Sequence, residues 1–156
     1  MLKKIFLLAI FIFVSSCGYK AIHSLKNNIS YDFSISELSF EGDRDINLKI
    51  KEKLNNYTLS EKEKDFILKI SSNSQKNITA KDGAGDPTGF KNIITVKIEI
   101  LNKGKTQSSL LFVEDFSYNN DSNKFNLKRY EKEIKNNLAG TVTDKLTFKL
   151  SNIKWY

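Results

Sequence analysis

The chain has 156 residues, of which 40% are hydrophobic and 28% charged, with 7 glycines and 1 proline. This composition is typical of one ordinary folded domain and argues against a disordered or collagen-like chain. The formal net charge is +7. Because there is only 1 cysteine, an internal disulfide is excluded.

The N-terminus has the three parts of a secretory signal peptide. Lys3 and Lys4 make a short positive region, residues 5–14 are all apolar, and small residues follow. Ten apolar residues span about 15 Å as a helix, half of a hydrocarbon core of about 30 Å, so a permanent membrane helix is not expected. We predict that residues 1–16 are removed on export.

The tetrad Val14-Ser15-Ser16-Cys17 resembles the lipobox of bacterial lipoproteins. Small residues fit the peptidase, and the thiolate is the nucleophile that accepts a diacylglyceryl group. Cys17 is therefore predicted to be the lipidated first residue, and two or three acyl chains anchor a protein durably. Gly18, in place of the Asp usual in inner-membrane lipoproteins, resembles the sorting pattern for the outer membrane.

Removal of Lys3 and Lys4 leaves 23 basic and 18 acidic residues, a net charge of +5. The excess is almost entirely lysine, which is typical of a solvated surface but also attracts anionic partners. An exported protein is not expected to meet nucleic acid, whereas lipid phosphates are suitable partners.

After a polar tether over residues 17–28, a single domain is expected over 29–156. Apolar alternation predicts a strand over residues 29–40, with a bulge or bend near Glu37 where the phase shifts. Apolar spacings of four, four and three then predict an amphipathic helix over 44–57.

That first helix has two candidate N-caps, Asp43 and Asp45. A second strand is predicted over 66–76, and residues 77–90, which hold three glycines and the proline, are predicted to be a loop or a mobile hairpin tip.

Residues 94–100 alternate cleanly and predict a third strand, followed by a hairpin turn over 102–105 and a return strand over 108–118. Apolar residues every four positions predict a long helix over 126–150, in which Gly140 costs about 1 kcal/mol relative to alanine. The order β-α-β-β-β-α predicts an α+β fold. We expect a two-layer sandwich with a four-stranded, mostly antiparallel sheet and two helices on one face.

The residues that usually carry catalysis are absent or separated. The single histidine, His23, lies in the tether, and no cluster has metal-ligand spacing. Glu114 and Asp115 are adjacent on a strand, so their side chains point to opposite faces. We therefore expect neither an enzyme nor a cofactor, apart from the covalent lipid on Cys17.

The return strand carries more apolar residues than one core face needs. Phe112 and Phe116 lie on one face, and Leu111 and Val113 lie on the other. Either a bulge turns both sets inward, or the surplus marks a partner or ligand. Under the second interpretation the predicted partner interface is Phe112, Phe116 and Tyr118.

Three features together resemble the lipopolysaccharide-assembly lipoprotein family, LptE. They are the opening Cys17-Gly18-Tyr19, the order of the elements, and the stretch 93–118 with its ending Phe116-Ser117-Tyr118-Asn119 ahead of a long helix. The resemblance covers residues 17–153. It implies a protein anchored in the outer membrane that faces the periplasm or sits largely inside the β-barrel LptD. There it would help the barrel assemble, plug it and bind lipopolysaccharide (LPS).

In that family, basic residues near strand ends and loops contact LPS. By location, the candidates in this chain are Lys76, Lys81, Lys91, Lys103 and Lys105. Two other functions stay open: a periplasm-facing lipoprotein that binds a lipid or solute for a transporter, and a structural lipoprotein that contacts the cell wall.

Overall fold

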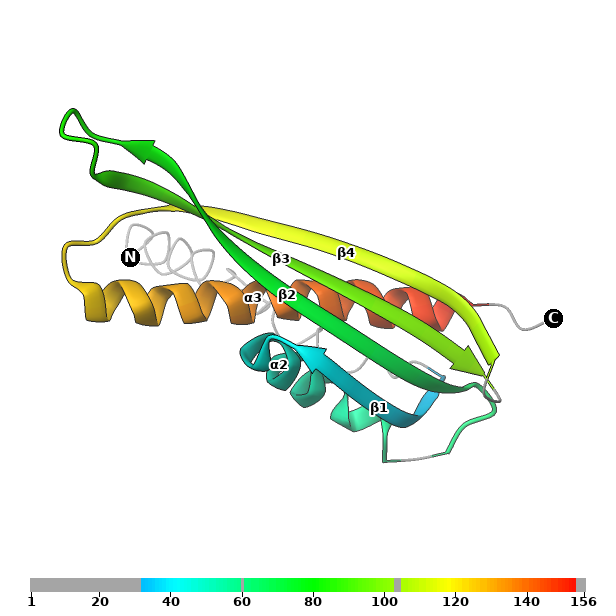
Figure 1. Ribbon diagram of the computed structural model, residues 1–156. Coiled ribbons are helices and arrows are strands. Elements are labelled where there is room, and N and C mark those ends of the chain that lie inside the picture. Colours follow the sequence, from blue (N-terminus) through cyan, green and yellow to red (C-terminus); the bar gives the residue numbers. More distant parts are fainter. Residues whose placement is uncertain (1–31, 60, 103–104, 154–156) are drawn as a thin grey trace, which may run out of the picture. The chain divides into compact units, whose positions relative to one another are not determined.

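The computed structural model describes residues 32–59, 61–102 and 105–153 (Figure 1). The elements are β1 (Ser34–Gly42), α2 (Arg44–Leu54) with the short 3-10 turn η2 (Asn55–Tyr57), β2 (Asp65–Lys81), β3 (Pro87–Asn102), β4 (Lys105–Asn119) and α3 (Lys124–Asn152). The predicted signal peptide, Cys17, the tether, the start of the first strand at 29–31 and the turn at 103–104 lie outside the described residues.

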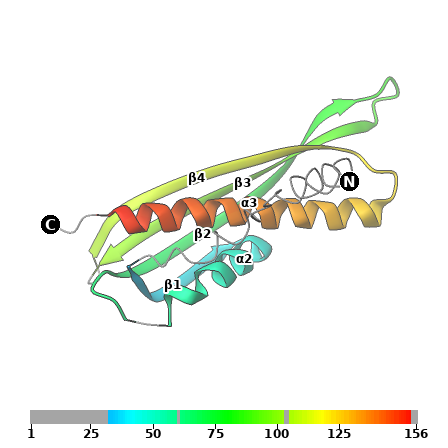
Figure 2. The same cartoon turned by 180° about the vertical axis from the view of Figure 1, so that it is seen from behind.

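The four strands form one sheet in the order β1-β2-β3-β4. β1 runs parallel to β2, and the other two pairs are antiparallel. α2 connects the two parallel strands, as a crossover must, and packs beside α3 on the same face of the sheet (Figures 1 and 2). The predicted α+β fold, with its element order and its two helices on one face, is confirmed.

The core lies between the sheet and the helices. Alternate side chains of β3 point into it, and Ile94, Val96, Ile98 and Ile100 are completely buried. The helices contribute to the core the apolar residues that recur about every four positions in the sequence. These are Ile46, Ile50 and Leu54 from α2, and Ile134, Leu138, Val142, Leu146 and Leu150 from α3.

The first strand and helix meet at a tight junction. The register of β1 against β2 shifts between Ile35 and Glu37, which confirms the predicted irregularity. Gly42 ends the strand at a φ of 94°, and a Cβ there would lie 1.8 Å from the Ser72 carbonyl oxygen. Only glycine fits this approach. Of the two candidate caps, Asp43 caps α2 through the N–H groups of Asp45 and Ile46.

The hairpin of β2 and β3 is longer than the sequence predicted. The loop predicted for residues 77–90 is wrong for most of its length, because β2 continues to Lys81 and β3 starts at Pro87. The real turn is residues 82–86, where Asp82 accepts hydrogen bonds from the N–H groups of Ala84 and Asp86. This arm of the hairpin extends past the end of β1, so its polar residues need no core-facing alternation (Figure 1).

Candidate functional site: the distal hollow and the outer strip

The structure decides which face of β4 is covered. Phe112, Phe116 and Tyr118 stand opposite Val96, Asn92 and Phe90 of β3, on the face that the helices cover. No register shift interrupts this part of the pair, so no bulge turns both sets inward.

Two of the three residues predicted as a partner interface are therefore not at a free surface. Tyr118 is 7% exposed, and Phe112 is half-buried against the core. Phe116 is 45% exposed, and its contact with a partner stays a prediction. The interface assignment is corrected for Phe112 and Tyr118, because strand alternation places the opposite set in the open.

The uncovered sheet face carries an apolar strip, formed by Ile93, Leu111 and Val113, which we call the outer strip. Leu111 is 66% exposed and Val113 55% exposed. Val113 stands opposite Thr95, which places it diagonal to the half-buried Ile93. An antiparallel sheet face that meets water is normally polar, so these exposed apolar side chains make the outer strip a candidate contact surface.

On the covered face, a polar and aromatic network surrounds Tyr118. Its hydroxyl donates to the Glu131 carboxylate at 2.9 Å and lies 3.3 Å from the Asn92 amide oxygen. Burial, followed by this bond to Glu131, raises the pKa of Tyr118 above its ordinary value. The Lys76 ammonium completes the network, 2.5 Å from Glu131 and 3.8 Å from the centre of the Phe90 ring.

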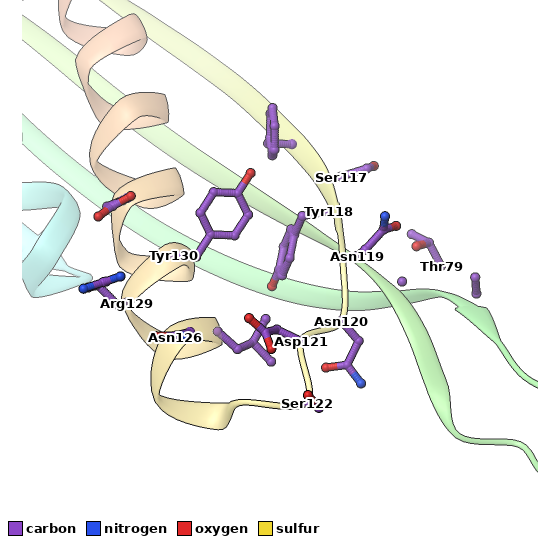
Figure 3. A pocket seen from close by; sticks show the side chains of 15 residues that line it. Thr79, Ser117, Tyr118, Asn119, Asn120, Asp121, Ser122, Asn126, Arg129 and Tyr130 are labelled. Atoms are coloured by element: carbon purple, nitrogen blue, oxygen red, sulfur yellow. The ribbon is translucent and has the colours of Figure 1, made fainter.

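Beside this network lies a hollow of about 950 Å³, which we call the distal hollow. It is bounded by the end of β4, the turn into α3, the first turns of α3 and the β2–β3 arm (Figure 3). Tyr130 reaches from α3 toward Tyr118, and the two rings meet edge to face with 5.9 Å between their centres. Three amides also line it: Asn119, Asn120 and Asn126.

The charges of the distal hollow do not favour a phosphate by themselves. Its lining includes Arg129 but also Asp121 and Glu133. The Asn120 side chain donates to the Pro87 carbonyl at 2.7 Å, whereas its amide oxygen is buried and has no hydrogen-bond partner among the described residues. Aromatic edges and amides around an open hollow suit a polar, hydroxyl-rich ring such as a sugar.

The candidate lysines are not brought together. Lys76 points to the helix side of the sheet and pairs with Glu131, whereas Lys91 lies on the outer face and pairs with Asp115 at 3.1 Å. Lys81 is exposed at the end of the arm and has no ion-pair partner among residues that the structure describes.

Of the other two lysines, the structure describes only Lys105, which lies at the opposite end of β3 from Lys81. Lys105 starts β4 opposite Asn102, and Lys103 lies outside the described residues. Lys76 and Lys105 therefore do not belong to one site, because they lie toward opposite ends of β3, and the contact of each candidate lysine with LPS stays a prediction.

Within residues 32–59, 61–102 and 105–153, no three His, Cys, Asp or Glu side chains come together in a way that could hold a metal ion. The helices in the same part of the chain are too short or too polar to cross a membrane.

Sequence reasoning missed most of the distal hollow. Tyr130 is the first of the residues, four positions apart, that predict the helix over 126–150, yet it is 44% exposed and lines the hollow. The available signal was the run Asn119-Asn120-Asp121-Ser122, a cluster of side chains that hydrogen-bond well, placed directly between an aromatic strand end and a helix.

These features define a two-layer α+β domain with one sheet face covered by helices and the other open. No family model matches the chain, and no curated protein matches it by sequence. Solved structures do share its fold.

The chain is similar to the rare lipoprotein B from Shewanella oneidensis, with a TM-score of 0.55 and 12% identity over 74% of this chain and 97% of that one. It is also similar to a minor lipoprotein from Acinetobacter baumannii, with a TM-score of 0.55 and 17% identity over 78% of this chain and 91% of that one. The chain thus shares the fold of these two bacterial lipoproteins over about three quarters of its length.

Proposed function

We propose that this protein is an outer-membrane lipoprotein that forms a complex with an LptD-type β-barrel and supports delivery of LPS to the cell surface. It acts by binding and assembly rather than by catalysis. The lipid on Cys17 holds the domain at the membrane, and the domain supplies the protein surface that the barrel contacts.

The observation that carries this proposal is the outer strip. Leu111 and Val113 are more than half exposed on the sheet face that no helix within residues 32–153 covers. A domain enclosed by a barrel buries such surface, whereas a free monomer leaves it in water. The fold shared with two bacterial lipoproteins and the lipobox at Cys17 agree with this placement.

The distal hollow supplies a place for the sugar part of LPS. Aromatic edges from Phe116 and Tyr130 and the amides at the end of β4 suit sugar hydroxyls. Lys81, which is exposed beyond the hollow, offers a cation to a lipid phosphate.

The test is copurification of the full-length lipoprotein from outer membranes in mild detergent. We expect an approximately one-to-one complex with a β-barrel protein. The double variant Leu111→Lys, Val113→Lys should keep the melting temperature and lose the barrel, because two charges then replace the outer strip. Leu48→Lys, at a position on α2 that is 53% exposed, is the matched control and should retain the barrel.

Copurification of the wild type without any barrel would contradict the proposal. The anchor is tested separately: Cys17→Ala should abolish incorporation of labelled palmitate, and incorporation into that variant would refute the lipidation site.

The second candidate function is a lipoprotein that binds a lipid or solute for a transporter. The distal hollow is the observation in its favour, and its polar lining suits a solute better than an acyl chain. Recovery of a bound small molecule without a barrel supports this function instead.

A further inference from the structure

The sheet has three stretches of free strand edge in the described part of the chain. The first is β1, the second is the part of β2 beyond its last β1 partner at Ser72, and the third is β4 along its whole length. A free edge is a row of unpaired N–H and C=O groups, and proteins normally block it with lysine, proline, bulges or short length.

Two of these edges are blocked in the ordinary ways. β1 has only 9 residues, is irregular between Ile35 and Glu37, and ends at Gly42. The free part of β2, residues 73–81, carries Lys76 and Lys81, and its register against β3 shifts twice near its end.

The third edge is not blocked. β4 has 15 residues, and from residue 106 to 119 it contains no lysine, arginine, proline or glycine. Its register against β3 is unbroken from Ser108 to Asn119. The side chain of Glu114 points to the helix-covered face and forms an ion pair with Lys145 of α3. Its charge is therefore compensated and does not repel a strand added at this edge. At about 3.3 Å per residue, this is roughly 45 Å of open edge.

We propose that the free edge of β4 binds an extended segment of the barrel protein as a fifth strand, by β-augmentation. This inference rests on the proposed function and names the mode of contact. Backbone hydrogen bonds along β4 hold the added strand, and the alternate apolar side chains of that strand cover Leu111 and Val113.

The chemistry of the edge selects this occupant. Water satisfies the edge groups in the free domain, but another extended backbone matches the spacing of all of these donors and acceptors at once, and the exposed Leu111 and Val113 favour apolar neighbours on the same face. The wall strands of a closed barrel are paired on both sides, so the segment comes from a loop or a chain terminus of the barrel protein. A second copy of this chain carries the same net positive charge, which disfavours its approach relative to a neutral or acidic segment.

Hydrogen exchange resolved to single amides tests the proposal on the native full-length protein, alone in detergent and in its complex with the barrel. In a strand at a sheet edge, every second N–H points outward and exchanges fast. We expect these outward amides of residues 106–119 to exchange at least about a hundredfold more slowly in the complex. The free edges of β1 and of residues 73–81 are internal controls and should not change.

Substitutions provide a second readout. The N–H groups of Ser108 and Ser109 point to opposite sides of β4, so one of them points outward, away from β3. Proline at the outward-pointing position removes that N–H and leaves the pairing with β3 intact. That proline variant should keep the melting temperature and weaken the complex about tenfold, since one hydrogen bond is lost. Ser108→Ala and Ser109→Ala, which keep the N–H, should bind normally.

The outcomes separate the two proposals. An intact barrel complex in which the outward amides of β4 still exchange fast overturns β-augmentation and leaves the proposed function standing. Protection that appears in the lipoprotein alone together with a doubled mass shows that a second copy occupies the edge, and it also overturns the inference. Absence of any barrel complex overturns the proposed function and this inference together.

Discussion

Asp43 joins three elements, and its replacement gives a sharp test of the fold. Its Oδ1 caps α2, while its Oδ2 accepts hydrogen bonds from Ser74 of β2 at 2.7 Å and from Lys135 of α3 at 2.8 Å. The side chains of Asp43 and Lys135 are 17% and 24% exposed, so solvent screens this pair less than a surface pair. We compare Asp43→Ala, which removes all of these bonds, with Asp43→Asn, which keeps the capping oxygen.

The magnitudes follow from the separate contacts. Loss of an N-cap costs about 1 kcal/mol, and each bond to a charged group contributes about 1.5 kcal/mol or more. Asp43→Ala should therefore lower the free energy of unfolding by about 4 kcal/mol, because the cap and both bonds to the carboxylate are lost, and Asp43→Asn by about 3 kcal/mol, because only the cap is kept. Asp45→Asn, the same chemical change in the first turn of the helix, should cost about 0.5 kcal/mol because it affects only the helix dipole.

At acid pH, the wild type and Asp43→Asn should have nearly the same free energy of unfolding. Burial raises the pKa of the Asp43 carboxyl, but the hydrogen bonds from Lys135, Ser74 and the Ile46 N–H outweigh it, so the pKa is lower than in the unfolded chain. The carboxylate therefore stabilises the fold above the unfolded value of about 3.9, and its contribution is lost as the pH falls through the lower folded value.

Urea unfolding of the detergent-solubilised protein, from pH 7 to pH 2.5, measures both effects. Equal destabilisation by Asn and Ala, or a difference between wild type and Asp43→Asn that stays constant down to pH 2.5, would refute this account of the junction.

Three further predictions use the same unfolding assay. Gly42→Ala should cost more than about 3 kcal/mol, because it combines a positive φ with a Cβ in collision with the Ser72 carbonyl; a near-neutral result contradicts the junction geometry. Gly140→Ala should instead stabilise α3 by about 0.5 to 1 kcal/mol, since a Cβ there meets nothing closer than 3.7 Å; a loss of stability shows that α2 and α3 approach more closely. Tyr118→Phe should cost about 1 to 2 kcal/mol through loss of its bond to Glu131, and an unchanged midpoint means that the bond contributes nothing.

The sequence alone predicted what depends on periodicity along the chain. Apolar residues every four positions located α2 and α3, and alternation at residues 94–100 located the centre of β3, because each pattern matches the geometry of one element. The phase shift near Glu37 likewise predicted the irregularity of β1. The N-terminal lipobox is a local signal that needs no fold, so the proposed anchor depends on sequence only.

The candidate site was only partly predictable. The sequence showed that β4 has too many apolar residues for one face, but it did not show that Phe112, Phe116 and Tyr118 lie on the face that the helices cover. The long arm of β2 and β3 was mistaken for a loop, because the three glycines and the proline within residues 77–90 outweighed the short alternation that Ile78 and Ala80 continue. In the structure, β2 continues to Lys81 because it pairs with β3 over this stretch.

Tertiary structure decided the features that join distant segments. The register of β4 against β3 buries Tyr118 and leaves Leu111 and Val113 exposed, because a shift of one residue exchanges the two faces of a strand. The distal hollow forms because the first turns of α3 lie beside the end of β4. β4 is the last strand in the sheet, so one of its edges is open. The sequence pattern of a single strand does not reveal the order of strands in the sheet.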